Sequence, residues 1–540
     1  MAEVDTDVVI VGAGPAGLAL ATELTMRGRT VTVLERGGDT GVQPRAKTTN
    51  VRSMTHMRRW GLAGTVRERS PLRPDFPRRV SFQLSPFSPP IFDFEDAFCA
   101  SPRRREEFPE HAEFIPQYVI GRILGEHVGT HPRARIDFGA TVTGFVEDGD
   151  RVRVDIDTAG GPRSVTARYV VGADGARSTI RKHLGIRMTG QSDIARLVTL
   201  ILRIPGLVDD PDLHGALFHW ILNPEATSFL GPMDVDDLWF FGTSADHDTD
   251  TEVLLAKARR AIGRDAFEPT VVTRDDWTVH SLIADSYRKG RAFLIGDACH
   301  LHSPFGGHGM NLGIADAVDL GWKLSARLDG WGTESLLDSY EIERRQAHQA
   351  VIESATINVA TLSEHYANSA LAQDGPAGDA ARARAAEAIE IDKSPEFRSL
   401  GLVLGYRYSG SPALAPDDRP ADPIEISHYR PCARPGHLAP HAWVNGATSL
   451  YDLFGPVFTF LDLGEGPSGL DEILDAARSQ GIPLTVRAME SVKLDRLYGV
   501  RFALIRPDQH IAWSGDTLLS PDAYVSLMRG EAMALRTEPA

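Results

Sequence analysis

Near its N-terminus the chain has the sequence Val8-Val-Ile-Val-Gly-Ala-Gly-Pro-Ala-Gly-Leu-Ala-Leu-Ala21. The four apolar residues that open it predict a buried strand of a parallel sheet. Gly12, Gly14 and Gly17 follow in the spacing G-x-G-x-x-G, and a helix is predicted from there to about Met26. Gly12 permits a tight turn, Gly14 lets backbone approach a pyrophosphate, and Gly17 lets the helix pack closely on the strand. The phosphates would then lie at the free N–H groups of the helix N-terminus.

A second apolar run, Thr30-Val-Thr-Val-Leu34, ends in Glu35. An acid about 20 residues beyond such glycines is placed to bind ribose hydroxyls. Strand, glycines, helix, second strand and acid together predict a βαβ dinucleotide site, in which the nucleotide is either FAD or NAD(P). A glycine-rich turn without a ligand is the alternative.

The composition indicates a globular protein of several domains. With 540 residues, 42 % hydrophobic and 24 % charged, the chain can bury a large core. Its net charge of −16 argues against nucleic acid or an anionic membrane as the main partner. No apolar run approaches the ~20 residues of a membrane-spanning helix. The acidic N-terminus lacks the basic region of a secretory signal, so we expect a cytoplasmic protein.

Cysteine usage gives no sign of a metal or disulfide framework. Cys99, Cys299 and Cys432 are the only cysteines and lie far apart. His300 and His302 stand beside Cys299, but their spacing fits no usual metal site, and we expect no metal.

Two further motifs follow the first along the chain. In Tyr169-Val-Val-Gly-Ala-Asp-Gly-Ala-Arg-Ser178 a short buried strand ends in Asp174-Gly175. Later, a strand over 293–295 places Gly296-Asp297 at its C-terminal end, the edge where open α/β sheets bind ligands. A long helix is predicted to start near Met310.

The order of strand-like, helical and loop-like stretches in the sequence predicts four successive parts of the chain. Strand-like runs between 195 and 241 predict an antiparallel sheet in an inserted domain, with one helix over about 251–262. Residues 366–395 are predicted to be a mobile loop with one alanine-rich helix. The expected parts are the first part of the dinucleotide-binding domain (1–186), an inserted domain (187–284), the second part of the dinucleotide-binding domain with long helices (285–395), and a linker with a C-terminal domain (396–540).

In the C-terminal part the predicted strands and helices follow the order of a thioredoxin-like domain. Leu450-Tyr-Asp-Leu-Phe454 is predicted as its first strand and a last helix lies beyond Pro521. The absence of C-x-x-C excludes dithiol exchange there.

Together, the three motifs resemble those of the group A flavoprotein monooxygenases, the FAD-dependent aromatic hydroxylases built like p-hydroxybenzoate hydroxylase. The tail resembles the branch that contains phenol hydroxylase, 2,4-dichlorophenol 6-monooxygenase and polyketide hydroxylases. The residues that carry the resemblance are Gly12-x-Gly14-x-x-Gly17 with Glu35, Asp174-Gly175, Gly296-Asp297, Pro304-x-Gly306-Gly307, and in the tail Arg434-Pro-Gly436, Pro440-His441, Asp452-Leu-Phe-Gly455 and Arg506-Pro-Asp508.

This resemblance implies an α/β protein with an FAD-binding Rossmann-like fold, an inserted antiparallel-sheet substrate domain and a thioredoxin-like C-terminal domain. It implies that NAD(P)H reduces FAD, that O2 then forms a flavin C4a-hydroperoxide, and that this species hydroxylates a phenolic or polycyclic ring in a dry pocket. The single G-x-G-x-x-G fits single-component enzymes, in which nicotinamide binds transiently.

The expected FAD site combines physical argument with resemblance. Asp297 can accept hydrogen bonds from ribityl hydroxyls, and glycines let backbone lie against the flat flavin ring. The helix starting near Met310 directs its N-terminal dipole at the flavin edge that becomes negative on reduction. The expectation that Arg45 and Gln117 contact the flavin rests on the resemblance. The expected cofactor-binding residues are Gly12, Gly14, Pro15, Ala16, Gly17, Glu35, Arg36, Arg45, Gln117, Asp174, Gly296, Asp297, Pro304, Gly306, Gly307, Gly309, Met310 and Asn311.

Arg45, His308 and Trp220 are the candidate catalytic residues. His308 could help deprotonate a phenol, or it could be a backbone spacer. In the strand Leu217–Leu222, Phe218 and Trp220 share one face, and either face could meet the flavin. Trp220 could equally be a core residue.

Other functions remain open on sequence alone. A Baeyer–Villiger oxygenase or an oxidase acting on an aromatic natural product would use the same fold, and a non-catalytic flavoprotein would bind FAD alone. A flavin halogenase is disfavoured because no W-x-W-x-I-P segment is present. The sequence does not distinguish NADH from NADPH, and a homo-oligomer such as a dimer is compatible with it.

Overall fold

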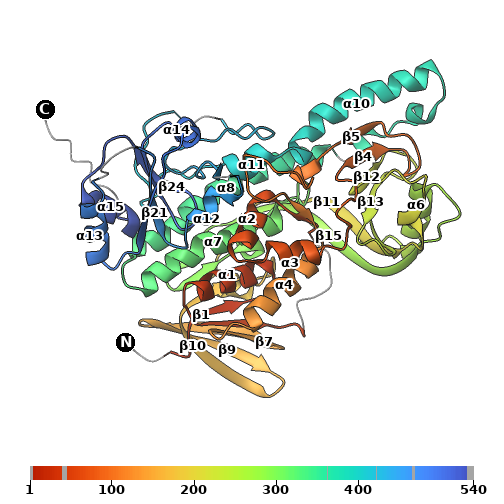
Figure 1. Cartoon of the computed structure of the whole chain (residues 1–540). Helices are drawn as coiled ribbons and strands as arrows, with labels where there is room; N and C mark the ends of the chain where they lie inside the picture. The colour runs from red at the N-terminus through yellow and green to blue at the C-terminus, as the bar shows by residue number, and fades with distance from the viewer. Residues whose placement is uncertain are drawn as a thin grey trace.

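The computed structural model describes residues 4–38, 46–361, 363–420, 423–444, 446–464 and 469–531 (Figure 1). Its first sheet confirms the predicted dinucleotide fold. The parallel strands, in spatial order, are β17 (Ala292–Leu294), β10 (Gly161–Gly172), β1 (Thr6–Val11), β2 (Val31–Glu35) and β7 (Ala134–Phe138). β16 (Arg288–Lys289), β8 (Thr141–Asp148) and β9 (Arg151–Thr158) extend this sheet by antiparallel pairing.

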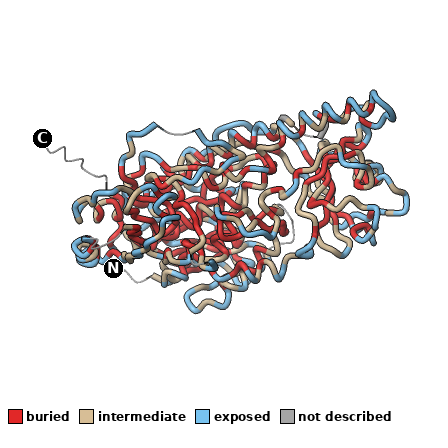
Figure 2. Tube along the Cα trace, turned by 45° about the horizontal axis from the view of Figure 1, so that its top comes forward, coloured by how far each residue is buried: buried red, intermediate tan, exposed pale blue. Residues whose placement is uncertain are grey.

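Helices pack against this sheet and against one another. α1 (Pro15–Met26) lies between α4 (Gln117–Gly129) and α7 (Gly309–Leu328), and α8 (Glu334–Ala360) packs on α7. The near-continuous apolar run of β1 is fully buried, as expected for a strand covered on both faces. In Figure 2, the buried residues, drawn in red, gather in the interior of the molecule. Shorter helices are α2 (Val51–Arg59), α3 (Ala63–Glu68) and α5 (Thr179–His183).

A second sheet of eight strands forms the predicted antiparallel domain, but it is not confined to residues 187–284. β4 (Val80–Gln83) and β5 (Phe92–Phe94) precede that range, and β18 (His300–Leu301) follows it. β4 joins because it pairs in parallel with β12 and so covers an edge that would otherwise be open. The remaining strands are β11 (Met188–Arg203), β12 (Phe218–Ile221), β13 (Ser228–Pro232), β14 (Leu238–Ser244) and β15 (Thr270–Ala284).

Two helices cover the two faces of this second sheet. α6 (Thr251–Ile262) has the predicted bounds and buries Leu254 and Ala258 against one face. α10 (Pro376–Phe397) packs Ile389 and Phe397 against the other face. The alanine-rich helix predicted within 366–395 is present as α10, but it occupies most of that range, so the loop is shorter than predicted.

The C-terminal domain has the predicted thioredoxin-like arrangement. Its four strands, in spatial order, are β22 (Leu484–Ala488), β21 (Phe458–Asp462), β23 (Phe502–Ile505) and β24 (Ile511–Gly515), with β21 and β22 parallel. The helices are α13 (Asp471–Ser479), α14 (Val492–Tyr498), which was not predicted, and α15 (Pro521–Arg529).

The predicted strand over 450–454 is wrong. Leu450–Leu453 is a short helix, α12, because Ser449 and Asp452 form a capping box in which each side chain bonds the other's backbone N–H. Among the described residues, no helix combines the length and apolarity needed to cross a membrane.

Candidate active site

The three glycines of the turn between β1 and α1 differ in whether a Cβ atom would fit. A Cβ on Gly12, where φ is +110°, would lie 2.4 Å from the carbonyl oxygen of Ala173. A Cβ on Gly17 would lie 2.1 Å from the carbonyl oxygen of Gly12. A Cβ on Gly14 would meet no atom within 4 Å. Gly12 and Gly17 are therefore required by the turn itself, whereas Gly14 borders open space at the start of α1, as a pyrophosphate would need.

The carboxylate of Glu35 is held beside this turn. Its Oε2 accepts the N–H of Ala13 and its Oε1 accepts the N–H of Gly37, each at 2.8 Å. Because a carboxylate oxygen has more than one acceptor site, both oxygens can still accept ribose hydroxyls. Arg36, the next residue, is exposed.

The first and third motifs meet at the start of α1. Pro15 occupies the first turn of the helix, and the Cβ of Ala16 lies 3.2 Å from where a Cβ on Gly296 would be. A Cβ on Gly313 of α7 would lie 3.0 Å from the same methyl group. These small residues bring the helix start, the turn after β17 and the helix α7 into direct contact.

One carboxylate oxygen of Asp174 stabilises a helix, whereas no contact in the described chain accounts for the other. Oδ2 accepts the N–H of Thr179 at 2.6 Å and that of Ile180 at 3.3 Å, which stabilises the start of α5. Oδ1 is buried and has no hydrogen-bond partner in the described chain. The bonds to the start of α5 therefore account for only one of the two oxygens of this carboxylate.

Asp297 follows β17 in a turn that a buried carboxylate anchors. The Asp297 side chain is exposed at the sheet edge, while the N–H of Gly296 donates to Asp316 Oδ2 at 3.0 Å. His300 Nε2 lies 3.0 Å from the same oxygen, and Arg344 Nε donates to Asp316 Oδ1 at 2.7 Å.

Sequence analysis missed Asp316, whose only signal is an acid in the otherwise apolar stretch 312–318. His348 Nε2 lies 2.9 Å from Asp316 Oδ1, and the carboxylate is completely buried. Although burial alone would raise it, the neighbouring His348 and Arg344 hold the pKa of Asp316 well below its usual range. Asp316 therefore stays ionised and ties the turn at Gly296 to α7 and α8.

Residues 302–308, the glycine loop, connect β18 to α7. Gly306 and Gly307 have φ of +98° and +68°, and a Cβ on Gly307 would lie 2.9 Å from the Cβ of Thr48. Pro304 and Gly309 flank them, and α7 begins at Gly309, one residue before the predicted Met310. The loop is thus a backbone surface without side chains at its centre.

Asn311 holds the glycine loop in place instead of presenting a free amide. Its Nδ2 donates to the carbonyl oxygens of Thr48 at 2.8 Å and Gly307 at 2.6 Å. Its Oδ1 accepts the N–H of Asn50 at 2.9 Å.

Several buried polar atoms beside the loop lack partners in the described chain. They are His302 Nε2, His308 Nε2 and both amide atoms of Asn358. Burial lowers the pKa of His308 to about 4 and that of His302 to about 3, so both rings are neutral at pH 7. Since buried polar groups are normally paired, this set indicates a polar ligand against the loop.

One face of the second sheet meets the glycine loop. The Phe305 ring centroid lies 5.9 Å from that of Trp220 and 6.2 Å from that of Phe229. Phe218, Trp220, Phe229 and Phe240 share this face, which we call the aromatic wall. The opposite face carries His219. The face that carries Trp220 is therefore the one that contacts the glycine loop.

Trp220 itself is packed inside the wall. Only 1 % of it is exposed, its ring stacks on Phe82 at 5.4 Å, and Lys393 Nζ lies 4.3 Å from its centroid. In this structure it has the core position that the sequence left as an alternative to substrate contact.

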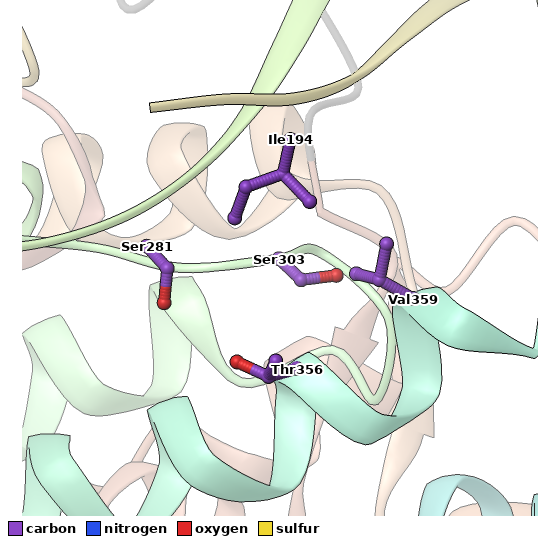
Figure 3. Close-up of a pocket in the computed structure, with 5 residues that line it drawn as sticks. All are labelled: Ile194, Ser281, Ser303, Thr356 and Val359. Atoms are coloured by element: carbon purple, nitrogen blue, oxygen red, sulfur yellow. The ribbon is translucent and has the colours of Figure 1, made fainter. Parts of the chain in front are cut away.

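Open space lies beside the loop. A cavity of about 230 Å³ is lined by Ile194, Ser281, Ser303, Thr356 and Val359, from β11, β15, the start of the loop and α8 (Figure 3). Hydroxyl and aliphatic groups thus surround it.

Two expected flavin contacts are less defined. Arg45 lies outside the described residues. Gln117 begins α4, and its N–H donates to the carbonyl oxygen of Ala46 at 2.8 Å. The residues around the nucleotide turn and the loop fit FAD, because Gly14 leaves space, Asp174 Oδ1 lacks a partner in the described chain and so do the buried polar atoms beside the loop.

Comparison with known proteins agrees with this geometry. The family model for an FAD binding domain matches residues 5–355, and that for the C-terminal domain of aromatic-ring hydroxylases matches residues 432–530. The chain belongs to the FAD-dependent aromatic-ring hydroxylases, the group A flavoprotein monooxygenases. It is accordingly an FAD-dependent monooxygenase, with NAD(P)H as co-substrate.

Relatives are similar along nearly their whole length. Aklavinone 12-hydroxylase of Streptomyces peucetius is 30 % identical over 86 % of this chain and 92 % of its own. The 4-methyl-5-nitrocatechol 5-monooxygenase of a Burkholderia species is 31 % identical over 97 % of both chains. A solved structure of the rebeccamycin biosynthetic enzyme RebC with reduced flavin is 34 % identical, with a TM-score of 0.89 over 98 % of this chain and 100 % of that one.

Proposed function

We propose that the enzyme hydroxylates a phenolic or polycyclic aromatic substrate held between the glycine loop and the aromatic wall. The observation that carries the proposal is the contact of Phe305 with Trp220 and Phe229, which places a continuous aromatic surface beside the loop. Aromatic side chains bind planar rings through stacked or edge contacts. The names of the relatives, which act on aklavinone and on a nitrocatechol, support a ring of this class.

When bound, FAD supplies the redox chemistry with NAD(P)H and O2. The chain binds the cofactor at Gly14, Glu35 and Asp297, and the wall excludes water from the reacting ring. His308, neutral at pH 7 because burial lowers its pKa, can accept a proton at Nε2. Arg45 and Gln117 are proposed to contact the flavin.

The test measures NAD(P)H consumption by the FAD-loaded protein with a panel of phenols and polycyclic aromatics, with NADH and NADPH in parallel. Stimulation by an aromatic compound, with one oxygen atom from ¹⁸O2 in a hydroxylated product, is the expected result. A ring-inserted ester would favour a Baeyer–Villiger oxygenase. Tight FAD binding with no aromatic-dependent turnover would indicate a non-catalytic flavoprotein.

A cytoplasmic location and a homo-oligomer such as a dimer belong to the same proposal. Cys99 and Cys299 form no disulfide within the described residues, which suits a reducing compartment. Size-exclusion chromatography with light scattering measures the oligomeric state.

A further inference from the structure

Lys47 lies between the glycine loop and the second sheet. It precedes β3 (Thr48–Thr49), whose Thr48 packs against Gly307, and its carbonyl oxygen accepts the N–H of Ile115 at 2.6 Å. Side chains alternate along an extended segment, so Lys47 points to the side opposite Thr48. Its Nζ lies 3.7 Å from the centroid of the Phe240 ring.

The ammonium group of Lys47 therefore lies on the aromatic wall. Phe240 is 6.3 Å from Phe229, which is 6.2 Å from Phe305 of the glycine loop. A continuous series of rings thus connects Lys47 to the loop, on the face of the sheet where the substrate is proposed to bind.

No acidic side chain in the described parts of the chain forms an ion pair with Lys47. The other lysine on the wall, Lys393, is paired with Glu396 at 2.7 Å. Burial of its ammonium group lowers the pKa of Lys47 to about 8. The residue is half-buried, and a partly desolvated cation without a counterion is costly, whereas contact with a Phe ring returns only about 0.5–2 kcal/mol.

We propose that Lys47 is a substrate-binding residue whose ammonium group holds the oxygen of a phenolic or enolic ring as an oxyanion at the Phe240 end of the aromatic wall. The proposal rests on the proposed function and narrows it to substrates with an ionisable hydroxyl group. The negative oxygen supplies a counterion that Lys47 lacks among the described residues, and it donates electron density to the ring that is to be hydroxylated.

The same ion pair forms whether the pH lies below or above the pKa of Lys47, although the proton of the phenol goes to a different acceptor. When Lys47 is already an ammonium, the O–H bond of the phenol breaks and its proton leaves to solvent. When Lys47 is a neutral amine, the proton moves to Nζ, where an N–H bond forms. Both routes end with an ammonium–phenolate pair.

The experiment is an optical titration without NAD(P)H, which therefore does not depend on turnover. FAD-loaded wild type, Lys47→Met, Lys47→Gln and Lys47→Arg are titrated with 4-nitrophenol and with alizarin, whose visible absorbance reports ionisation. Lys182→Met, at an exposed lysine of α5, is the matched control. Flavin absorbance before each titration verifies that the variant retains its fold and cofactor.

We expect wild type, Lys182→Met and Lys47→Arg to bind a probe as the oxyanion at a pH below the probe's own pKa. Lys47→Met and Lys47→Gln should bind at least 10-fold more weakly and leave the bound probe neutral. Oxyanion binding by both neutral variants at wild-type affinity would overturn the proposal, and so would a wild type that binds neither probe or binds it only in neutral form. Failure of the proposed function is distinguishable, since it shows as oxyanion binding without aromatic-dependent NAD(P)H consumption.

Discussion

Replacing Gly14 with alanine should weaken FAD binding while leaving the folded apoprotein intact. The residue has φ −72° and ψ 172°, which alanine adopts freely, and an added Cβ meets no protein atom within 4 Å. Loss of unfolded-state freedom stabilises such a change by about 0.4–1 kcal/mol, and the poorer helix cap costs a similar amount. The free energy of unfolding should therefore change by less than about 1 kcal/mol.

The effect on the cofactor is larger because the methyl group enters the space assigned to the pyrophosphate. Overpacking of about 1–3 kcal/mol corresponds to a loss of roughly 5- to 150-fold in FAD affinity. Fluorescence titration of the apoprotein with FAD measures it, and thermal unfolding measures stability. Gly17→Ala is the matched control, because its Cβ would lie 2.1 Å from the carbonyl oxygen of Gly12 and should destabilise the protein itself. Wild-type FAD affinity in Gly14→Ala, or unfolding like that of Gly17→Ala, would refute the reasoning.

Three further predictions concern the cofactor site, the buried carboxylate of α7 and the second sheet. Asp297→Ala should weaken FAD retention during dialysis, read from flavin absorbance, because a ribityl acceptor is lost. Asp316→Ala should lower the free energy of unfolding by roughly 3–5 kcal/mol in urea, since it leaves buried Arg344 without its carboxylate. Stability should fall as pH drops below 6.5, because burial lowers the pKa of His219 to about 3 and the unfolded chain takes up the proton first. His219→Gln should reduce that slope by up to about 1.4 kcal/mol per pH unit in acid unfolding.

Each of these has a result that counts against it. Full FAD occupancy after long dialysis would contradict the role of Asp297. An Asp316→Ala protein as stable as wild type would show that the network does not depend on this carboxylate. For His219, an unchanged acid-unfolding curve would mean that other groups dominate the pH dependence.

Features that depend on neighbours in the chain could be predicted from the sequence. The βαβ unit follows from glycine spacing and one apolar run, and α6 was predicted to the residue because Asp250 caps its start and Gly263 ends it with φ of +75°. The error at Leu450–Leu453 has the same origin, since apolar content favoured a strand while the capping pair at Ser449 and Asp452 selected a helix.

Features that depend on distant partners could not be predicted. Nothing local in Val80–Gln83 shows that it pairs with β12, more than 130 residues later. The importance of Asp316 arises from Arg344 and His348, which reach it from another helix. Likewise, Lys47 is notable only because Phe240 lies under its ammonium group. The glycine motifs predicted the FAD-binding domain, but the side chains proposed to surround the substrate required the folded chain.

The second sheet takes its strands from three separate segments of sequence: β4 and β5, then β11 to β15, and finally β18. A chimera that exchanges only residues 187–284 with a relative would therefore keep the native strand beside β12 and create a mismatched seam through the aromatic wall. Recombination that aims to transfer substrate preference within this family needs to move all three segments together. The same dispersal means that changes in preference accumulate at distant places in the gene rather than in one exchangeable block.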